Sequence, residues 1–75
     1  MVIQKGERYR HYKGNEYLVL AIARHSETTE QMVIYEGQYT DPEFGHNPVW
    51  ARPYDEFIEE VEVDGTMVSR FTHIT

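Results

Sequence analysis

The sequence predicts an all-β domain, a small, partly open barrel of five to six short antiparallel strands with one short helical turn. Three observations support this fold class. Short runs of β-branched and aromatic residues recur, turn residues separate these runs, and the chain has only 75 residues. A domain of this size buries only about 60% of its unfolded surface, and a flat sheet would leave an apolar face in water. We therefore expect residues 1–75 to form one domain around a curled sheet.

The first two strands are predicted on either side of Gly14 and Asn15. The run ERYRHY at 7–12 alternates and carries three ring side chains, and Gly14-Asn15 then supplies a tight hairpin turn. The run EYLVLAIARH at 16–25 is the most apolar stretch of the chain. Its spacing also suits a helix, but the turn directly before it favours a strand. A two-residue turn places His11 opposite Leu18.

That register assigns the two faces of the hairpin, because a slip by one residue would exchange them. The predicted core face holds five side chains, Tyr9, His11, Leu18, Leu20 and Ile22. The predicted outer face holds the alternate set, Arg8, Arg10, Tyr12, Tyr17, Val19, Ala21, Ala23 and His25. Further core residues are expected from later strands, namely Val33, Tyr35 and Trp50.

Later elements follow from turn residues. SETTEQ at 26–31 is a polar turn and MVIYEG at 32–37 a third strand. Residues 38–48 contain Asp-Pro, Gly and Asn-Pro and predict a loop that is either functional or disordered. VWAR at 49–52 is a fourth strand. PYDEFIEE at 53–60 begins with a proline and two early acids, which favour a helical turn. VEVDGTMV at 61–68 is an Asp-Gly hairpin that adds one or two strands to the sheet, and 72–75 is a tail.

Charge limits the partners of the chain. Thirteen acidic and seven basic residues give a net charge of −6, which disfavours nonspecific nucleic-acid binding. The charges are unevenly distributed, since residues 54–64 carry six acids and no base. Five of the bases lie in the first third of the chain, at Lys5, Arg8, Arg10, Lys13 and Arg24. A local basic surface is therefore compatible with the acidic total.

Composition also bounds the location and the cofactors. The chain has no cysteine, which excludes disulfides and thiolate chemistry and fits a reducing compartment. It has neither an apolar signal core nor a run approaching the roughly 20 residues that cross a bilayer. We therefore expect a cytoplasmic protein without a membrane segment. Phosphate-binding and dinucleotide-binding glycine patterns are absent, so no cofactor is predicted.

Two Arg-His pairs stand where a strand meets a turn, Arg10-His11 and Arg24-His25. On the predicted outer face, small alanines leave a shallow floor between arginine and tyrosine, which suits a flat or anionic ligand. Alternatively, the arginine stems cover apolar wall and pair with carboxylates. His11 on the core face is typical of a hydrogen-bonded structural histidine. The two histidines are expected on opposite sides of the sheet, and so not as one catalytic pair.

Other groups of residues also have side chains suited to catalysis or binding. His25 with Ser26 and Glu27 has the residue types of a hydrolase, but adjacent turn residues rarely meet the required geometry, so no catalytic residue is predicted. The four histidines lack a recognised metal-ligand spacing, so no metal site is predicted. Trp50 is either core or part of an aromatic groove with Tyr35, Tyr39 and Tyr54. The candidate ligand-binding residues are Arg10, His11, Tyr12, Lys13, His25, Ser26, Glu27, Tyr35, Trp50 and Arg52.

Several motifs resemble a known bacterial family. These are YRHYKG at 9–14, ARHSET at 23–28, Val33 with Tyr35, and the segment from Trp50 to Phe57. Together they closely resemble the bacterial proteins grouped as domain of unknown function 1653, over residues 6–71. The resemblance implies an SH3-like barrel in a cytoplasmic bacterial protein, and it implies no activity.

The sequence therefore predicts a noncatalytic binding module whose partner is a small ligand, a peptide or a nucleic-acid element. One alternative is a small enzyme that uses His11 or His25 as a general acid or base. Another is an assembly subunit that pairs through exposed strands. The ligand and the oligomeric state are not specified by the sequence.

Overall fold

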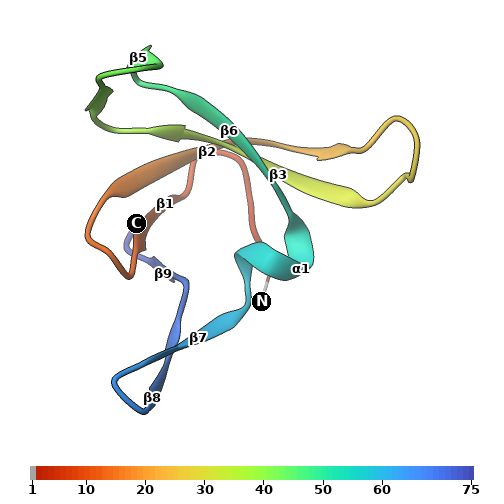
Figure 1. Cartoon of the computed structure of the whole chain (residues 1–75). Helices are drawn as coiled ribbons and strands as arrows, with labels where there is room; N and C mark the ends of the chain where they lie inside the picture. The colour runs from red at the N-terminus through yellow and green to blue at the C-terminus, as the bar shows by residue number, and fades with distance from the viewer. Residues whose placement is uncertain (1) are drawn as a thin grey trace.

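The computed structural model describes residues 2–75 and consists mainly of antiparallel strands (Figure 1). Five strands form the main sheet in the order β6-β3-β2-β1-β9. Their bounds are β1 (Arg8–His11), β2 (Glu16–Arg24), β3 (Gln31–Gly37), β6 (Val49–Pro53) and β9 (Phe71–His73). Two small hairpins and one helical turn complete the described chain, namely β4 (Thr40–Asp41) with β5 (Gly45–His46), β7 (Glu60–Val63) with β8 (Thr66–Ser69), and α1 (Tyr54–Phe57). The predicted all-β fold with one short helical turn is confirmed.

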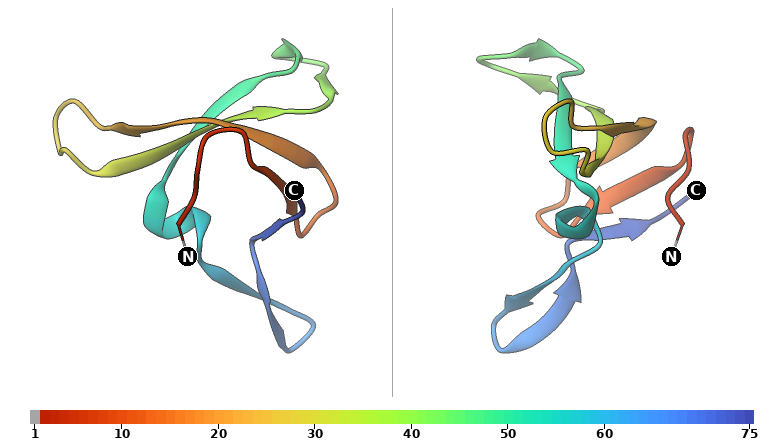
Figure 2. Two further views of the ribbon diagram at one scale, coloured as in Figure 1. Left: turned by 180° about the vertical axis from the view of Figure 1, so that it is seen from behind. Right: turned by 90° about the vertical axis from the view of Figure 1, so that its right-hand side faces the viewer.

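The main sheet is strongly curled. Arg52 on β6 and Phe71 on β9 come from its opposite edges, yet the guanidinium carbon lies 5.7 Å from the centre of the phenyl ring. In a flat sheet, four strand spacings would separate these edges by about 19 Å. The edges are not hydrogen-bonded to each other, so the sheet stays an open barrel. Figure 2 shows the curl from two sides, with the β7–β8 hairpin projecting away from it.

The core fills the concave side of this sheet. It consists of Ile3, Tyr9, Val19, Val33, Tyr35, Phe57 and Phe71. Phe57 and Phe71 stack with ring centres 4.0 Å apart, and the ring of Tyr9 meets Phe57 edge-on at 5.2 Å. The single helical turn carries Phe57 into this cluster, directly after Pro53 begins the turn with a φ of −52°. Helix α1 therefore closes the open side of the core with one buried ring.

The predicted pairing of the first hairpin is wrong by three residues. Arg8 lies opposite Leu18, and Tyr9 lies opposite Tyr17. The cause is a four-residue connection rather than a two-residue turn. The Gly14 N–H donates to the His11 carbonyl at 2.7 Å, and Gly14 has a φ of +112°, so the glycine stands at the last position of a β-turn.

A shift by an odd number of residues exchanges the two faces of a strand. Tyr17 and Val19 therefore point into the core with Tyr9, although they were expected outside, and Leu18 is excluded from it. A bulge between Val19 and Ala21 reverses the alternation once more and returns Ile22 to the core side.

The remaining residues predicted for the core are partly confirmed. Val33 and Tyr35 are buried as expected, and Ile22 and Trp50 pack against the core. Leu20 lies within the bulged part of β2 and does not belong to the core cluster, so its predicted core position is wrong.

The segment 38–48 is ordered around a small hairpin. Thr40 of β4 pairs with His46 of β5, and the Asp41 carboxylate accepts hydrogen bonds from the backbone N–H groups of Glu43 and Phe44 at 2.8 and 2.9 Å. The segment predicted as a loop thus contains a short two-stranded hairpin.

The C-terminal region differs from its predicted role in the sheet. The Asp-Gly turn is confirmed, with positive φ angles of 50° at Asp64 and 80° at Gly65, as a two-residue hairpin of this kind requires. The hairpin forms a separate two-stranded sheet, however, and does not extend the main one. Strand β9 instead pairs with β1, with Tyr9 opposite His73, although residues 72–75 were expected to be a tail. Within residues 2–75, no helix has the length and apolar character needed to cross a bilayer.

Candidate functional site

Two hollows lie beside β1. The larger one, here called the outer groove, has a volume of about 450 Å³ and is lined by Arg10, His11, Tyr12, Gly14, Val63, Val68, Ser69, Thr72 and Ile74. The smaller one, here called the aromatic pocket, has a volume of about 220 Å³ and is lined by His11, Tyr17, Tyr35, Tyr39, Trp50, Arg52 and Phe71. His11 belongs to both.

Every strand of the main sheet contributes to the aromatic pocket. Its residues come from β1 (His11), β2 (Tyr17), β3 (Tyr35), β6 (Trp50 and Arg52) and β9 (Phe71), with Tyr39 from the segment between β3 and β4. In a flat sheet these side chains would be spread along one face. The curl of the sheet therefore creates the pocket.

The rings of the pocket pack edge to face. The ring centres of Tyr17, Tyr35 and Phe71 are 5.2–5.7 Å apart in all three pairings, with interplanar angles of 72–81°. Tyr39 meets Tyr17 at 5.7 Å and 89°. These are favourable arrangements for aromatic pairs, because the positive edge of one ring meets the negative face of the next. Contacts among the lining rings thus stabilise the walls of the pocket.

Hydrogen bonds hold the wall of the pocket that Tyr17, Tyr39 and Trp50 form. Trp50 Nε1 donates to the Tyr39 hydroxyl at 3.2 Å, and this hydroxyl lies 3.3 Å from that of Tyr17. Burial, followed by the interaction with Tyr39, raises the pKa of Tyr17 well above its ordinary value. The Tyr17 hydroxyl is therefore neutral at physiological pH and available as a hydrogen-bond donor or acceptor.

Gly37 makes room for this wall. A Cβ atom at Gly37 would lie 2.5 Å from Cε2 of Tyr39 and 2.8 Å from its Cζ. The backbone angle at this position is not one that requires glycine, so the need for a glycine arises from the close approach of the ring alone.

Arg52 is the charged group of the pocket. Its Nε donates to the Tyr35 hydroxyl at 3.1 Å, and its guanidinium carbon lies over the Phe71 ring. Among residues 2–75 no carboxylate forms an ion pair with Arg52, and no group of these residues forms a hydrogen bond with either Nη atom. The half-buried guanidinium is thus oriented by Tyr35 while both Nη groups remain available.

His11 adds a second donor. Its Nδ1 accepts a hydrogen bond from the Lys13 backbone N–H at 3.1 Å, so the neutral ring carries its proton on Nε2. Burial is the main factor that lowers the pKa of His11, and the charges of Arg52, Arg70 and Lys13 lower it further. All three cations disfavour protonation of the imidazole ring.

This composition decides against a cationic ligand. Aromatic cages attract cations through the ring faces, which contributes about 0.5–2 kcal/mol. A cation some 5 Å from the Arg52 guanidinium would be repelled by about 3 kcal/mol at an effective dielectric constant of about 20. The repulsion exceeds the attraction, so this arrangement disfavours a cation in the pocket.

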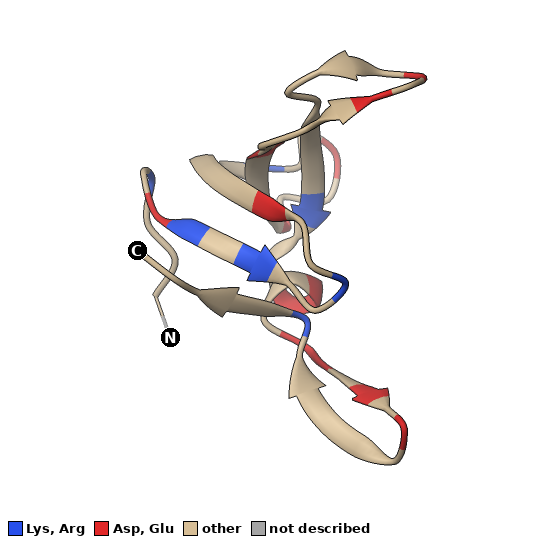
Figure 3. Ribbon diagram, turned by 90° about the vertical axis from the view of Figure 1, so that its left-hand side faces the viewer, with Lys and Arg blue, Asp and Glu red and all other residues tan. Residues whose placement is uncertain are grey.

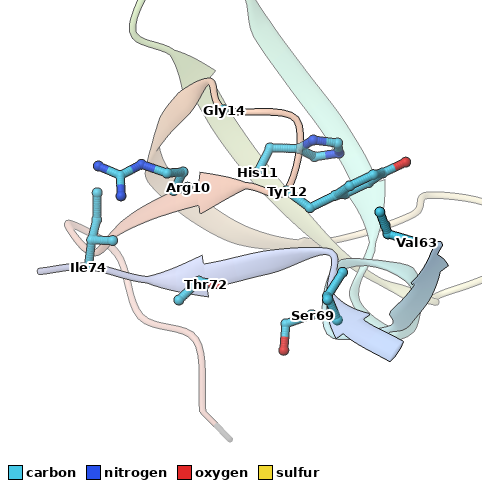
Figure 4. Close-up of a pocket in the computed structure, with 9 residues that line it drawn as sticks. Arg10, His11, Tyr12, Gly14, Val63, Ser69, Thr72 and Ile74 are labelled. Carbon is cyan, nitrogen blue, oxygen red and sulfur yellow. The ribbon is translucent and has the colours of Figure 1, made fainter. Parts of the chain in front are cut away.

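The outer groove has a different character. Arg10 is engaged with Glu16, whose carboxylate oxygen lies 3.0 Å from Nη2. Figure 4 shows Arg10 and Ile74 at one end of the groove and Tyr12 extending toward Val63 at the other. Figure 3 shows basic residues on β1 and acidic ones on the β7–β8 hairpin, which agrees with the uneven charge distribution along the chain. The groove is larger, but its arginine already has a partner.

The second Arg-His pair lies elsewhere. His25 stands after the end of β2, where its Nδ1 accepts hydrogen bonds from the backbone N–H groups of Glu27 and Thr28 at 3.2 and 3.4 Å. Arg24 donates to the Thr29 carbonyl at 2.9 Å. The two Arg-His pairs thus have the same structural role in two separate turns. In each turn the histidine accepts backbone hydrogen bonds and the arginine forms a hydrogen bond across the turn.

His11 and His25 are far apart. One lies beside the start of β2 and the other follows its end, and nine residues of strand span about 30 Å (Figure 1). They do not form one site. The two histidines are separated by the length of β2. The sequence instead predicted that they lie on opposite faces of the sheet.

Nine of the ten candidate residues therefore divide among three places, and Lys13 lies beside Tyr12. Arg10, His11 and Tyr12 line the outer groove, and His11, Tyr35, Trp50 and Arg52 line the aromatic pocket. His25, Ser26 and Glu27 belong to the distant turn, and Lys13 lies with its ammonium 5.8 Å from the centre of the Tyr12 ring. Tyr54, once considered for the aromatic groove, instead accepts a hydrogen bond from the Ile3 N–H at 3.2 Å.

Sequence reasoning missed two pocket residues. Tyr17 was assigned to the wrong face by the three-residue register error, and Phe71 was not considered because its neighbours were expected to be a tail. The signal for Phe71 was its position directly after the Asp-Gly hairpin, where a returning strand can rejoin the sheet. No grouping of three or more potential metal-ligating side chains occurs within residues 2–75.

Comparisons with known proteins agree with the fold. A family model described as "Protein of unknown function (DUF1653)" matches residues 7–73. A crystal structure of a DUF1653 protein from Bordetella bronchiseptica is similar, with 33% sequence identity, a TM-score of 0.82, and coverage of 96% of this chain and 87% of that one. No curated protein matches the chain. The suspected resemblance is confirmed, and the chain belongs to the DUF1653 family.

Proposed function

We propose that this chain is a noncatalytic binding domain that holds a small ligand in the aromatic pocket. The observation that carries the proposal is Arg52, a half-buried guanidinium oriented by Tyr35 and Phe71. Arg24 donates to a backbone carbonyl, and Arg10 and Arg70 have carboxylate partners at 3.0 and 2.9 Å. Arg52 has none within residues 2–75, which supports a role in binding an external acceptor.

A binding role is favoured over catalysis by His11. A general base needs a free nitrogen and usually a third group that orients the ring. The Nδ1 of His11 is used by the turn, and no ion pair between His11 and a carboxylate is present in the described chain. The hydrogen bond therefore supports a positioning role for the imidazole. We also propose that the curled sheet is an SH3-like open barrel. A cytoplasmic location is proposed as well, and the cysteine-free composition supports it.

Trp50 makes the proposal directly testable. It is the single tryptophan of the chain and it lines the pocket, so intrinsic fluorescence reports on the site itself. Fragment-sized anions, neutral compounds and cations would be screened by thermal shift, and each hit would be titrated against Trp50 fluorescence. We expect hits that change this fluorescence and that lose at least tenfold in affinity in Tyr39→Ala.

The matched control is Tyr12→Ala, because it removes another tyrosine ring, from the outer groove. This variant should bind the hits as the unaltered chain does. The proposal fails if no compound of any charge alters Trp50 fluorescence. It also fails if Tyr39→Ala, shown to be folded by circular dichroism, binds every hit unchanged.

A further inference from the structure

We propose that the ligand of the aromatic pocket is a small planar anion with a single ring, of which an aromatic carboxylate is the simplest example. This inference rests on the proposed function and adds the chemical class of the ligand. It is drawn from the size of the pocket, the position of its charge and the arrangement of its rings.

The size limits the ligand to one ring. An apolar cavity of about 150 Å³ is large enough to bind benzene. The aromatic pocket, at about 220 Å³, has room for such a ring and one small substituent. It is smaller than the roughly 300–1,000 Å³ typical of sites for drug-sized ligands. A second fused ring would have to remain partly in water.

The charge selects an anion. The Nη1 and Nη2 groups of Arg52 form a planar fork that matches the two oxygens of a carboxylate. Tyr35 holds Nε at 3.1 Å, so the fork is oriented before a ligand arrives. Lys13 adds positive charge near His11, a lining residue, whereas Arg70 is paired with Glu59. The net charge of −6 therefore does not describe the surroundings of the pocket.

The rings favour a flat ligand. Tyr17, Tyr35 and Phe71 are mutually edge-to-face, and another ring can continue such an arrangement. An aliphatic acid of equal charge would gain the ion pair and lose these ring contacts. Charge and planarity thus act on two different parts of one ligand.

The test compares four probes by Trp50 fluorescence at fixed ionic strength. Benzoate has both features, benzamide lacks the charge, acetate lacks the ring, and 2-naphthoate adds a second ring. We expect benzoate to bind at least tenfold more tightly than benzamide and acetate. We expect 2-naphthoate to gain no affinity over benzoate, despite its larger apolar surface.

Variants of Arg52 then locate the charge effect. Arg52→Gln should weaken benzoate binding at least tenfold and leave benzamide binding unchanged, and Arg52→Lys should restore only part of the benzoate affinity because it lacks the fork. Arg10→Gln is the matched control, since it removes an arginine already paired with Glu16, and it should bind benzoate as the unaltered chain does.

The outcomes separate this inference from the proposed function. If neutral or cationic single rings bind the pocket as tightly as benzoate, the binding function stands and the inference is overturned. The inference is also overturned if Arg52→Gln weakens benzoate and benzamide equally, or if 2-naphthoate binds more tightly than benzoate. If no probe and no compound from the wider screen binds, both proposals fail.

Discussion

The aromatic pocket and the outer groove share His11 but differ in how their arginines are satisfied. In the groove, Arg10 is paired with Glu16 at 3.0 Å, and the rest of the lining mixes apolar side chains such as Val63 and Ile74 with polar ones such as Ser69 and Thr72. In the pocket, Arg52 is oriented by a tyrosine hydroxyl and has no carboxylate partner within residues 2–75. The groove has about twice the volume of the pocket. Unfilled hydrogen-bonding capacity, rather than volume, is the property for which the pocket is proposed as the binding site.

The largest expected difference between the two hollows is in stability. Phe71, at the base of the pocket, is 3% exposed and stacks on Phe57, so Phe71→Ala should lower the free energy of unfolding by about 3–5 kcal/mol. Val63 in the outer groove is exposed, so Val63→Ala should change it by only about 0.5 kcal/mol. Urea denaturation followed by circular dichroism measures both. Equal losses in the two variants would show that the groove, too, is part of the core.

A second prediction concerns the wall of the pocket. Gly37→Ala would place a Cβ against the Tyr39 ring, and overpacking of this kind costs about 1–3 kcal/mol. Trp50 fluorescence should change as well, because Tyr39 accepts the indole hydrogen bond. In a Tyr39→Ala background the same alanine should have little further effect on stability. If the two changes are simply additive, the contact between Gly37 and the ring does not explain the glycine.

A third prediction uses the residue common to both hollows. The pKa of His11 is lowered in the folded chain, first by burial and then by Arg52, Arg70 and Lys13. In the unfolded chain, His11 has its ordinary pKa of 6.5. At a pH below 6.5 the unfolded state therefore binds the proton more readily than the folded state. The contribution of His11 is therefore complete above about pH 6.5 and is lost as the pH falls through the lower folded pKa.

His11→Asn tests this pH dependence. An asparagine oxygen can accept the Lys13 N–H in place of Nδ1, and it does not titrate. Chemical denaturation at a series of pH values from 7.5 to 5 should show a weaker loss of stability in the variant. If the variant loses stability over this range as the unaltered chain does, the dependence belongs to other groups.

The smallest expected effect lies in the outer groove. The Arg10–Glu16 pair is exposed, with 53% and 40% of the two side chains accessible, so Arg10→Ala should cost less than about 1 kcal/mol. Added salt should reduce this difference further. Urea denaturation at low and high ionic strength measures it. A loss of several kcal/mol that persists in high salt would mean that Arg10 is more than a surface partner.

Local signals in the sequence predicted most of the strands. Residues 32–37 and the Asp-Gly turn at 64–65 carry preferences that neighbouring residues alone determine, and each formed as expected. The single helical turn at Pro53 is another local signal, since proline fixes its own backbone angle.

Register could not be predicted in the same way. Gly14 can stand inside a two-residue turn or at the end of a longer one, and both possibilities fit YKGN. The choice depends on which face of β2 meets the core, and hence on Tyr9, Val19 and the bulge near Leu20. Local segments of the sequence pointed to Tyr35, Trp50 and Arg52, and also to His11 and Tyr39. Tyr17 and Phe71 depended on tertiary pairing.

The contribution of all five main strands to one pocket has a consequence for folding cooperativity. A ligand bound there contacts β1, β2, β3, β6 and β9 at once, and so it recognises only the fully assembled sheet. Binding free energy then adds to global stability by mass action. Hydrogen exchange should accordingly slow at those amides that exchange only through complete unfolding, in strands far from the ligand as much as in those that touch it.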